Sequence, residues 1–260
     1  MKFFLSIILL IVVSANGKSL KDAFLLCDFD ESRANCEIFT DNWNDEVEIK
    51  SIFRKNFNTN LTNESIDPKL LQEKVKFMKI SKTQMTSNLP QNIENHFKNL
   101  ESLRVTQTNL KFIARKSLKN FTNLRHLSLD SNKIEIIYND AFHDLTNLIS
   151  LFISNNKIDF LHPQLFVNSP KLRYFWSDYN QIEKVEENLF KNNKNIEWIN
   201  LSRNKIENIE IDFRKFKKLF YINLEKNRGS CNLIFDKFQN DNESAKIESF
   251  QDNVEKFCKK

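Results

Sequence analysis

The chain contains few of the residues on which catalytic motifs depend. In 260 residues it has two glycines, four histidines and four cysteines. With glycine only at Gly17 and Gly229, no glycine-rich loop is available to cradle a phosphate. The histidines are far apart, and none forms an HExxH pair; they are His96, His126, His143 and His162. We therefore expect no enzymatic activity, no cofactor and no metal site.

A repeated apolar pattern is the main feature that the sequence does contain. Segments of the form LxxLxLxxNxIxxIxxxxFxxL return about every 24 residues between Leu100 and Lys226. In LxxLxL, apolar positions alternate with outward ones, which predicts a short strand with one buried face. One complete repeat contains Leu124, Leu127, Leu129, Asn132, Ile134, Ile137, Phe142 and Leu145. Stacked repeats predict a solenoid whose strands form one parallel sheet.

Two residue types in the repeat have predictable structural roles. The asparagine lies where the chain leaves the sheet, and its amide can satisfy backbone groups that the turn would otherwise bury unpaired. An inward asparagine ladder is predicted at Asn132, Asn156, Asn180, Asn204 and Asn227, with Thr108 in the equivalent slot of an earlier repeat. The phenylalanines are predicted to fill the space behind the sheet; they are Phe142, Phe166, Phe190 and Phe213.

The cysteines lie where the two ends of a solenoid need covers. Cys27 and Cys36 precede the repeats, and Cys231 and Cys258 follow them. Four cysteines allow three pairings, and proximity in the chain favours Cys27 with Cys36 and Cys231 with Cys258. Disulfides imply an oxidising compartment. We divide the chain into residues 1–17 (signal peptide), 18–74 (N-terminal cap and loop), 75–227 (about six repeats) and 228–260 (C-terminal cap).

The N-terminus and the sequons agree with secretion. Lys2 precedes an apolar run from Phe3 to Val13 and then small residues, as in a signal peptide, and the run is too short for a confident membrane span. No later segment is apolar enough to be a membrane span. N-x-S/T sequons, which are glycosylation acceptors in secreted proteins, occur at Asn60, Asn63, Asn120, Asn200 and Asn242. We expect a soluble, extracellular glycoprotein.

Two sets of polar residues on the predicted sheet are candidate catalytic groups. His126 is expected on an outward strand position near Asp130, and we interpret it as a solvated polar residue rather than an acid–base group. Asp130 and Asp178 fall two repeats apart, so at about 4.8 Å per strand their backbones lie roughly 10 Å apart. That separation is wide for two carboxylates acting on one bond, although an inverting arrangement could use it. A solvated face is the preferred interpretation.

Large aromatic residues gather on the outward strand positions of the middle and later repeats. They are Phe152, Tyr174, Trp176, Trp198 and Tyr221. In a curved solenoid this sheet face is concave. Exposed aromatic clusters are costly unless covered, and Trp and Tyr are common binding anchors, so we predict that a partner docks here. The alternative is that neighbouring rings simply shield one another. A glycan on Asn200 would obstruct the patch.

From Val75 to Cys258 the repeats resemble extracellular leucine-rich repeat proteins. The stretch with Leu26-Cys27-Asp28-Phe29 and Asn35-Cys36 is similar to small secreted leucine-rich repeat proteins of insects. The resemblance implies a horseshoe with a concave parallel β-sheet and disulfide-linked caps, an α/β repeat fold that binds another macromolecule, often a protein. The chain differs from the commonest extracellular pattern in having two cysteines in each cap, where four are usual.

The charge pattern bears on which partner the chain binds. The formal net charge is +5, with basic residues scattered among acidic ones, whereas a nucleic-acid binder concentrates them in one stripe. We therefore expect a protein or other extracellular macromolecule as partner, and no nucleic acid. The leading hypothesis is secreted, non-enzymatic recognition of an extracellular or innate-immune type; the alternative is a structural, matrix or assembly protein.

Overall fold

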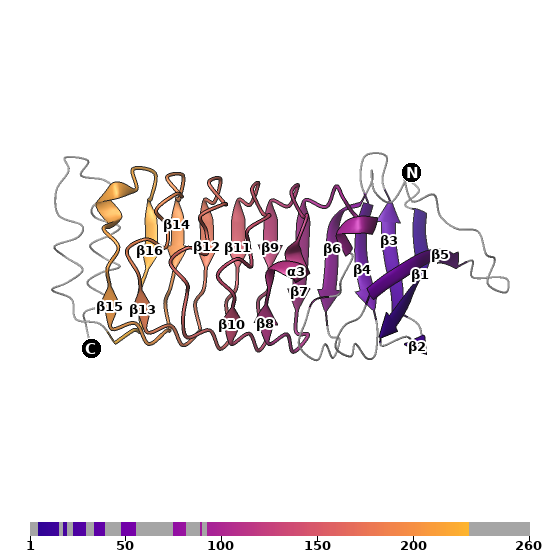
Figure 1. The fold of residues 1–260 in the computed structure, drawn as a ribbon, viewed down its shortest axis with the longest axis horizontal. Coiled ribbons are helices and arrows are strands. Elements are labelled where there is room, and N and C mark those ends of the chain that lie inside the picture. The colour runs from indigo at the N-terminus through magenta and orange to yellow at the C-terminus, as the bar shows by residue number, and fades with distance from the viewer. Residues whose placement is uncertain are drawn as a thin grey trace.

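The computed structural model describes residues 75–81, 89 and 93–228 with their side chains, except that of Arg214, and the backbones of strands at 5–15, 18–19, 23–29, 34–39 and 48–55. The main element is a 12-stranded sheet that runs along the length of the molecule (Figure 1). Its strands are stacked in the order β16-β14-β12-β11-β9-β7-β6-β4-β3-β1-β2, and β5 pairs with β1. The repeats therefore form a solenoid, as the sequence predicts.

Every repeat contributes one strand to this sheet. From β4 to β16 all neighbouring strands pair in parallel, and the registers join equivalent positions of successive repeats. The strands are β6 (Val75–Ser81), β7 (Ser102–Thr106), β9 (His126–Ser128), β11 (Ser150–Phe152), β12 (Tyr174–Trp176), β14 (Trp198–Asn200) and β16 (Tyr221–Asn223).

Antiparallel strands extend the sheet at its N-terminal end. These are β1 (Leu5–Ala15), β2 (Lys18–Ser19), β3 (Ala23–Phe29), β4 (Ala34–Phe39) and β5 (Glu48–Lys55). β1 occupies residues assigned above to the signal peptide and pairs with β2, β3 and β5. The signal peptide and the cap boundaries stay predictions.

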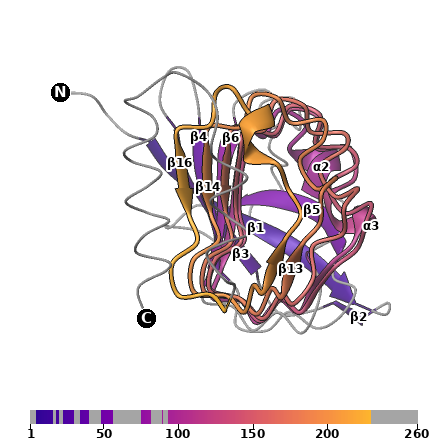
Figure 2. The ribbon, with the colours of Figure 1, turned by 90° about the vertical axis from the view of Figure 1, so that its left-hand side faces the viewer.

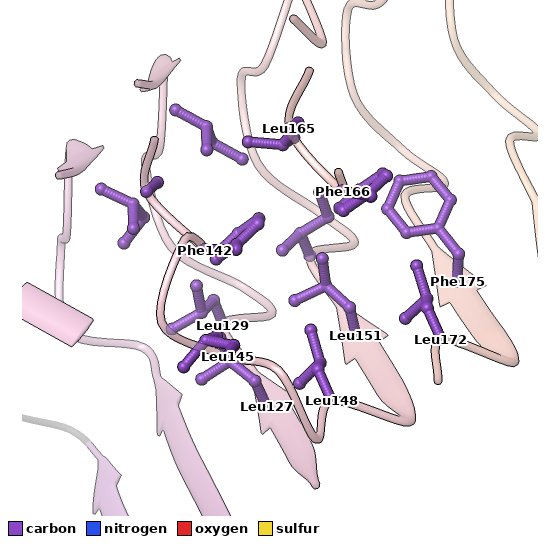
Figure 3. Close-up of a cluster of buried hydrophobic side chains, with 14 of the residues drawn as sticks. Leu127, Leu129, Phe142, Leu145, Leu148, Leu151, Leu165, Phe166, Leu172 and Phe175 are labelled. Carbon is purple, nitrogen blue, oxygen red and sulfur yellow. The ribbon is translucent and has the colours of Figure 1, made fainter. Parts of the chain in front are cut away.

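The apolar positions of the repeat form one continuous core. Leu127, Leu151 and Phe175 point inward from successive strands and are fully buried (Figure 3). Behind them, Phe142 and Phe166 stack with ring centroids 6.1 Å apart, and Phe166 and Phe190 stack at 5.4 Å. No repeat could bury this surface alone, so the stacking of neighbours stabilises the fold. The predicted roles of the leucines and phenylalanines are confirmed.

The asparagine ladder links each turn to its neighbours. The amide nitrogen of Asn156 donates to the carbonyls of Leu129 and Ile153, both at 3.0 Å, and its oxygen accepts the N–H of Ile134. The other members of the ladder make the same kinds of bond. Thr108 is buried in the equivalent slot and donates to Asn132 through its N–H and its hydroxyl. The ladder prediction is confirmed.

A left-handed residue precedes each ladder position. Ser131, Asn155, Tyr179, Arg203 and Lys226 have φ values of 57°, 55°, 53°, 54° and 58°. Glycine adopts this conformation most easily, but the repeats contain none. Residues with a Cβ adopt it instead, at a cost in conformational free energy. The sequence pattern did not reveal this feature because side-chain type varies freely at the position.

The return side of each turn contains little regular structure. It holds α2 (Ile93–His96), α3 (Arg115–Leu118) and the 3-10 helix η1 (Phe213–Lys215). Two small parallel sheets join β8 (Phe112–Ile113) to β10 (Ile136–Ile137) and β13 (Lys184–Val185) to β15 (Asn208–Ile209). Figure 2 shows α2 and α3 on the side opposite β14 and β16. Among the described residues, no helix has the length and apolar character needed to cross a membrane.

Candidate functional site

Four consecutive strands carry the predicted aromatic residues in two columns. The registers pair Tyr174 with Trp198 and Trp198 with Tyr221 in one column, and Phe152 with Trp176 in the next. These positions alternate with the buried Leu151, Phe175, Ile199 and Ile222. All five side chains therefore lie on the face of the sheet turned away from the core, here called the outer sheet face. We call Phe152, Tyr174, Trp176, Trp198 and Tyr221 the aromatic strip.

The rings of the aromatic strip pack against one another. Ring centroids of Phe152 and Trp176 lie 4.7 Å apart with planes 18° apart, and Trp176 and Trp198 follow at 5.6 Å and 27°. Tyr174 stacks on Trp176 at 6.2 Å, and Tyr221 lies 4.0 Å from Trp198. Each of the five side chains is half-buried. The rings therefore shield one another, as one of the two interpretations of the sequence expects, and docking of a partner on the strip stays a prediction.

An ion pair fixes one margin of the strip. Arg173 donates to both carboxylate oxygens of Glu197 at 2.8 Å, and the Tyr174 hydroxyl donates to Oε2 at 3.1 Å. The hydrogen bond from Arg173 is the main reason why the pKa of Glu197 lies below its usual value. This bidentate arrangement orients Tyr174 beside the Trp176 ring.

Phe220 is an additional aromatic residue that the sequence columns did not include. Its ring meets Trp198 edge to face at 5.4 Å, and 43% of its surface is exposed. The Trp198 indole N–H is buried without an acceptor among the described residues. Phe220 follows the buried Leu219 outside the strand, so only the folded geometry shows that it extends the strip.

A hollow of about 400 Å³ lies at the N-terminal end of the strip. Its walls include Lys79, Arg104, His126, Asp130 and Phe152, together with Ser128. Lys79 pairs in register with Arg104, and Arg104 pairs with Ser128. We call this site the polar hollow. It was not predicted as a site, although Arg104, Ser128 and Phe152 follow one another in a single outward column of the sequence.

Asp130 is held in a network rather than in bulk solvent. Ser128 donates its hydroxyl to Asp130 Oδ2 at 2.9 Å, and the Ser154 N–H donates to Oδ1 at 2.7 Å. The Ser154 hydroxyl in turn donates to Asp178 at 2.6 Å. Burial raises the pKa of Asp130. Asp130 is half-buried in the wall of the polar hollow, so it keeps some contact with solvent while its neighbours on adjacent strands hold it in place.

His126 is exposed, and its Nδ1 lies 3.1 Å from the Ser150 hydroxyl. Partial burial of the ring, followed by the nearby charge of Arg125, lowers its pKa. No carboxylate hydrogen-bonds to the ring among the described residues. His126 and Ser150 therefore place a hydroxyl beside a base, but without a third group that orients the ring we interpret the contact as a surface hydrogen bond.

The structure describes only some of the residues predicted to form disulfides or to carry glycans. The β3–β4 register sets the Cys27 backbone opposite that of Cys36, a spacing at which cysteines can bond. Cys231, Cys258, Asn60, Asn63 and Asn242 lie outside the described residues. Asn120 is exposed, with φ of 65°. Asn200 is half-buried on the outer sheet face, and its oxygen accepts the N–H and hydroxyl of Ser202. Both disulfide pairings and all glycans remain predictions.

The fold and its registered columns define the class of the protein. A family model described as leucine rich repeat matches residues 98–148, 137–175 and 178–228. The chain belongs to the leucine-rich repeat proteins, and its repeats form a solenoid with a parallel sheet. A search of curated proteins finds no match to this chain.

Solved structures share this fold at low sequence identity. The leucine-rich repeat domain of APL1 is 19% identical with a TM-score of 0.60, over 75% of this chain and 47% of that one. A chain of the Toll–Spatzle complex of Drosophila is 20% identical with a TM-score of 0.54, over 64% of this chain. This chain covers 26% of the Toll–Spatzle chain's length. At these identities the likeness concerns the fold alone.

Proposed function

We propose that this chain is a non-enzymatic recognition protein that binds a protein partner on the outer sheet face. The observation that carries the proposal is the aromatic strip, whose rings leave the core at four consecutive strands and pack on one another outside it. No ring of the strip is needed to fill the interior of a repeat, because Leu151, Phe175 and Ile199 already do so. Large rigid rings contribute contact area at little cost in conformational entropy.

The packing of the strip suits it to a protein surface. Stacking fixes the rotamers of Trp176 and Trp198 before any partner arrives, and the Glu197 contact fixes Tyr174. A prearranged surface loses less entropy on binding. The aromatic rings and the Asn200 amide, which pairs in register with Trp176, together resemble the mixed apolar and polar centre of a protein interface.

Three features of the sequence support an extracellular setting for this proposal. The apolar N-terminal run, the cysteine pairs and the sequons are features of the secretory route. The Toll–Spatzle structure is described as a hub in Drosophila development and innate immunity, and it joins two proteins. We propose extracellular recognition of that broad kind, with the partner's identity open.

One observation favours the alternative, a structural or assembly protein. On the return side, Ile136 and Tyr138 of one turn are 53% and 48% exposed, and Phe160 of the next turn is 45% exposed. The Tyr138 ring also meets Phe112 edge to face at 6.3 Å. This column is more exposed than the aromatic strip, and an assembly unit would use such a surface between copies.

Two measurements on the purified chain separate these functions. Sedimentation over a wide concentration range reports self-association, and capture from extracellular fluid on the immobilised chain reports a partner. A recognition protein stays monomeric and retains a protein whose capture is lost in Trp176→Ala and kept in Tyr138→Ser. Self-association that Tyr138→Ser abolishes, without partner capture by the outer sheet face, would instead establish the assembly function.

A further inference from the structure

The aromatic strip ends at Phe152 with one ring face uncovered. Phe152 stacks on Trp176, which lies on the next strand toward the C-terminus. On its other side the same column holds Ser128, whose side chain is too short to cover a ring. Phe152 lines the polar hollow at this point. The stack is therefore open at one place, above Ser128.

The open place has the dimensions of one aromatic ring. Phe152 and Arg104 each pair in register with Ser128, so their backbones are two strand spacings apart, about 9.6 Å. A planar group in van der Waals contact with both neighbours needs about 3.5 Å on each face, or about 7 Å in all. The hollow of about 400 Å³ has room for such a side chain. A guanidinium can stack on the second face of an inserted ring.

The charges of the hollow define what should accompany the ring. Arg104 is exposed and makes no hydrogen bond or ion pair with a described residue. Both oxygens of Asp130, the carboxylate in the wall of the hollow, accept hydrogen bonds from Ser128 and Ser154. The donors of the Arg104 guanidinium therefore remain available to a ligand, and a carboxylate suits their fork.

We infer that the polar hollow binds an aromatic side chain of a protein partner, inserted between Phe152 and Arg104, with a neighbouring acidic residue of that partner on Arg104. This inference rests on the proposed function and specifies the partner's chemistry. A nucleobase with its phosphate offers a similar shape. A nucleic acid, however, needs a basic track, and the outward positions of β9 to β16 hold no Lys or Arg.

The test uses short probes and the full chain. The probes are an acetylated, amidated Glu-Trp-Glu peptide, its Glu-Leu-Glu counterpart, its Gln-Trp-Gln counterpart and an oligothymidine of matched charge. Affinity is measured by isothermal titration for the parent, Arg104→Gln and Ser128→Phe, which fills the open place with a ring of the chain's own. Asn223→Phe adds the same ring at the far end of the same column and serves as the matched control. Thermal midpoints show that each variant is folded.

We expect the parent and Asn223→Phe to bind Glu-Trp-Glu alike, and the two other peptides to bind at least tenfold more weakly. Ser128→Phe and Arg104→Gln should each lose at least tenfold. The inference is overturned by equal binding of the Leu peptide, by undiminished binding to folded Ser128→Phe, by preference for the oligothymidine, or by no binding of Glu-Trp-Glu to the parent. The captured partner's sensitivity to Trp198→Ala, outside the hollow, tests the proposed function separately.

Discussion

The side-chain oxygen of Asn156 accepts the backbone N–H of Ile134 at 3.0 Å, although the two residues belong to different turns of the solenoid. The amide nitrogen of Asn156 meanwhile donates to carbonyls of both turns, at Leu129, Ile153 and Ser154. One buried side chain thus satisfies backbone groups that no strand can pair. The stability of the stack depends on this contact as well as on apolar packing.

Replacing Asn156 should destabilise the solenoid strongly. Asn156→Ala leaves the Ile134 N–H and several carbonyls buried without partners, which costs about 1 to 3 kcal/mol. The neighbouring Asn155 is exposed with φ of 55°, so the matched control is Asn155→Gly, which keeps this backbone conformation accessible. Urea unfolding should show a lower free energy for Asn156→Ala and nearly the parent value for Asn155→Gly. Equal midpoints for the two variants would mean that the ladder contributes nothing.

Asp130 should make the stability depend on pH in a defined direction. Its folded pKa is raised above the ordinary value of 3.8, mainly by burial, so the folded state binds the proton more tightly than the unfolded state. The stability it supports is therefore present below pH 3.8 and falls as the pH rises through the folded pKa. Asp130→Asn removes this titration. The free energy of unfolding of Asp130→Asn, relative to the parent, should rise over the range just above pH 3.8.

Glu197 provides the control of opposite sign. Its folded pKa is lowered, first by the hydrogen bond from Arg173, so its contribution is present above the ordinary value of 4.5 and is lost as the pH falls. Relative to Glu197→Gln, the parent should therefore lose stability on acidification. For Asp130, a difference in the free energy of unfolding between the parent and Asp130→Asn that stays constant across pH would contradict the raised pKa of its carboxyl group.

The cysteine pairs give a covalent prediction. We expect bridges from Cys27 to Cys36 and from Cys231 to Cys258, and the β3–β4 register, which sets the first two positions opposite each other, supports the former. Loop closure suggests about 2.7 kcal/mol for the first bridge and about 3.6 kcal/mol for the second. Mass mapping of peptides from the unreduced protein identifies the pairs. A bridge that joins the two ends of the chain would refute the assignment.

Glycans should avoid the outer sheet face. Asn120 is exposed on the return side, whereas Asn200 lies beside Trp176 and Trp198 with its oxygen occupied by Ser202. After expression through a secretory pathway, we expect peptide mapping to find Asn120 modified and Asn200 unmodified. Full occupancy of Asn200 would place a large sugar over the strip and count against partner binding there.

The sequence predicts the solenoid well because its signals are local and repeated. Leu127, Asn156 and Phe166 occupy positions that each have one structural role. The same residue types return at these positions in several repeats. The left-handed turn at Asn155 could not be predicted, since no glycine marks it. A second column was also missed: Asn123, Asn147 and Asn195 each donate to a backbone carbonyl of the preceding turn, at Lys98, Thr122 and Pro170.

For the candidate site, the sequence gives positions but not ring orientation. Parallel registers follow from the repeat, so the column with Phe152 and Trp176 was predictable. Whether those rings offer faces or edges depends on packing between strands, and the structure shows stacking. The polar hollow needs the same information, because it exists only where the stack ends above Ser128.

The proposed function depends on the aromatic strip, and the affinity of strip variants for the captured partner tests this dependence most directly. Because central anchors commonly contribute about 2 kcal/mol or more, Trp176→Ala and Trp198→Ala should each weaken binding by roughly tenfold or more. Loss of ring stacking should also lower stability by about 0.5 to 1.5 kcal/mol per pair, leaving a folded chain.

Lys119→Ala, an exposed substitution on the return side, should change neither property. Dissociation constants for the parent and the three variants are measured by isothermal titration against the same captured partner, with circular dichroism to confirm folding. We expect a loss of affinity confined to the two tryptophan variants. Parent-like affinity in both of them would contradict binding on the outer sheet face.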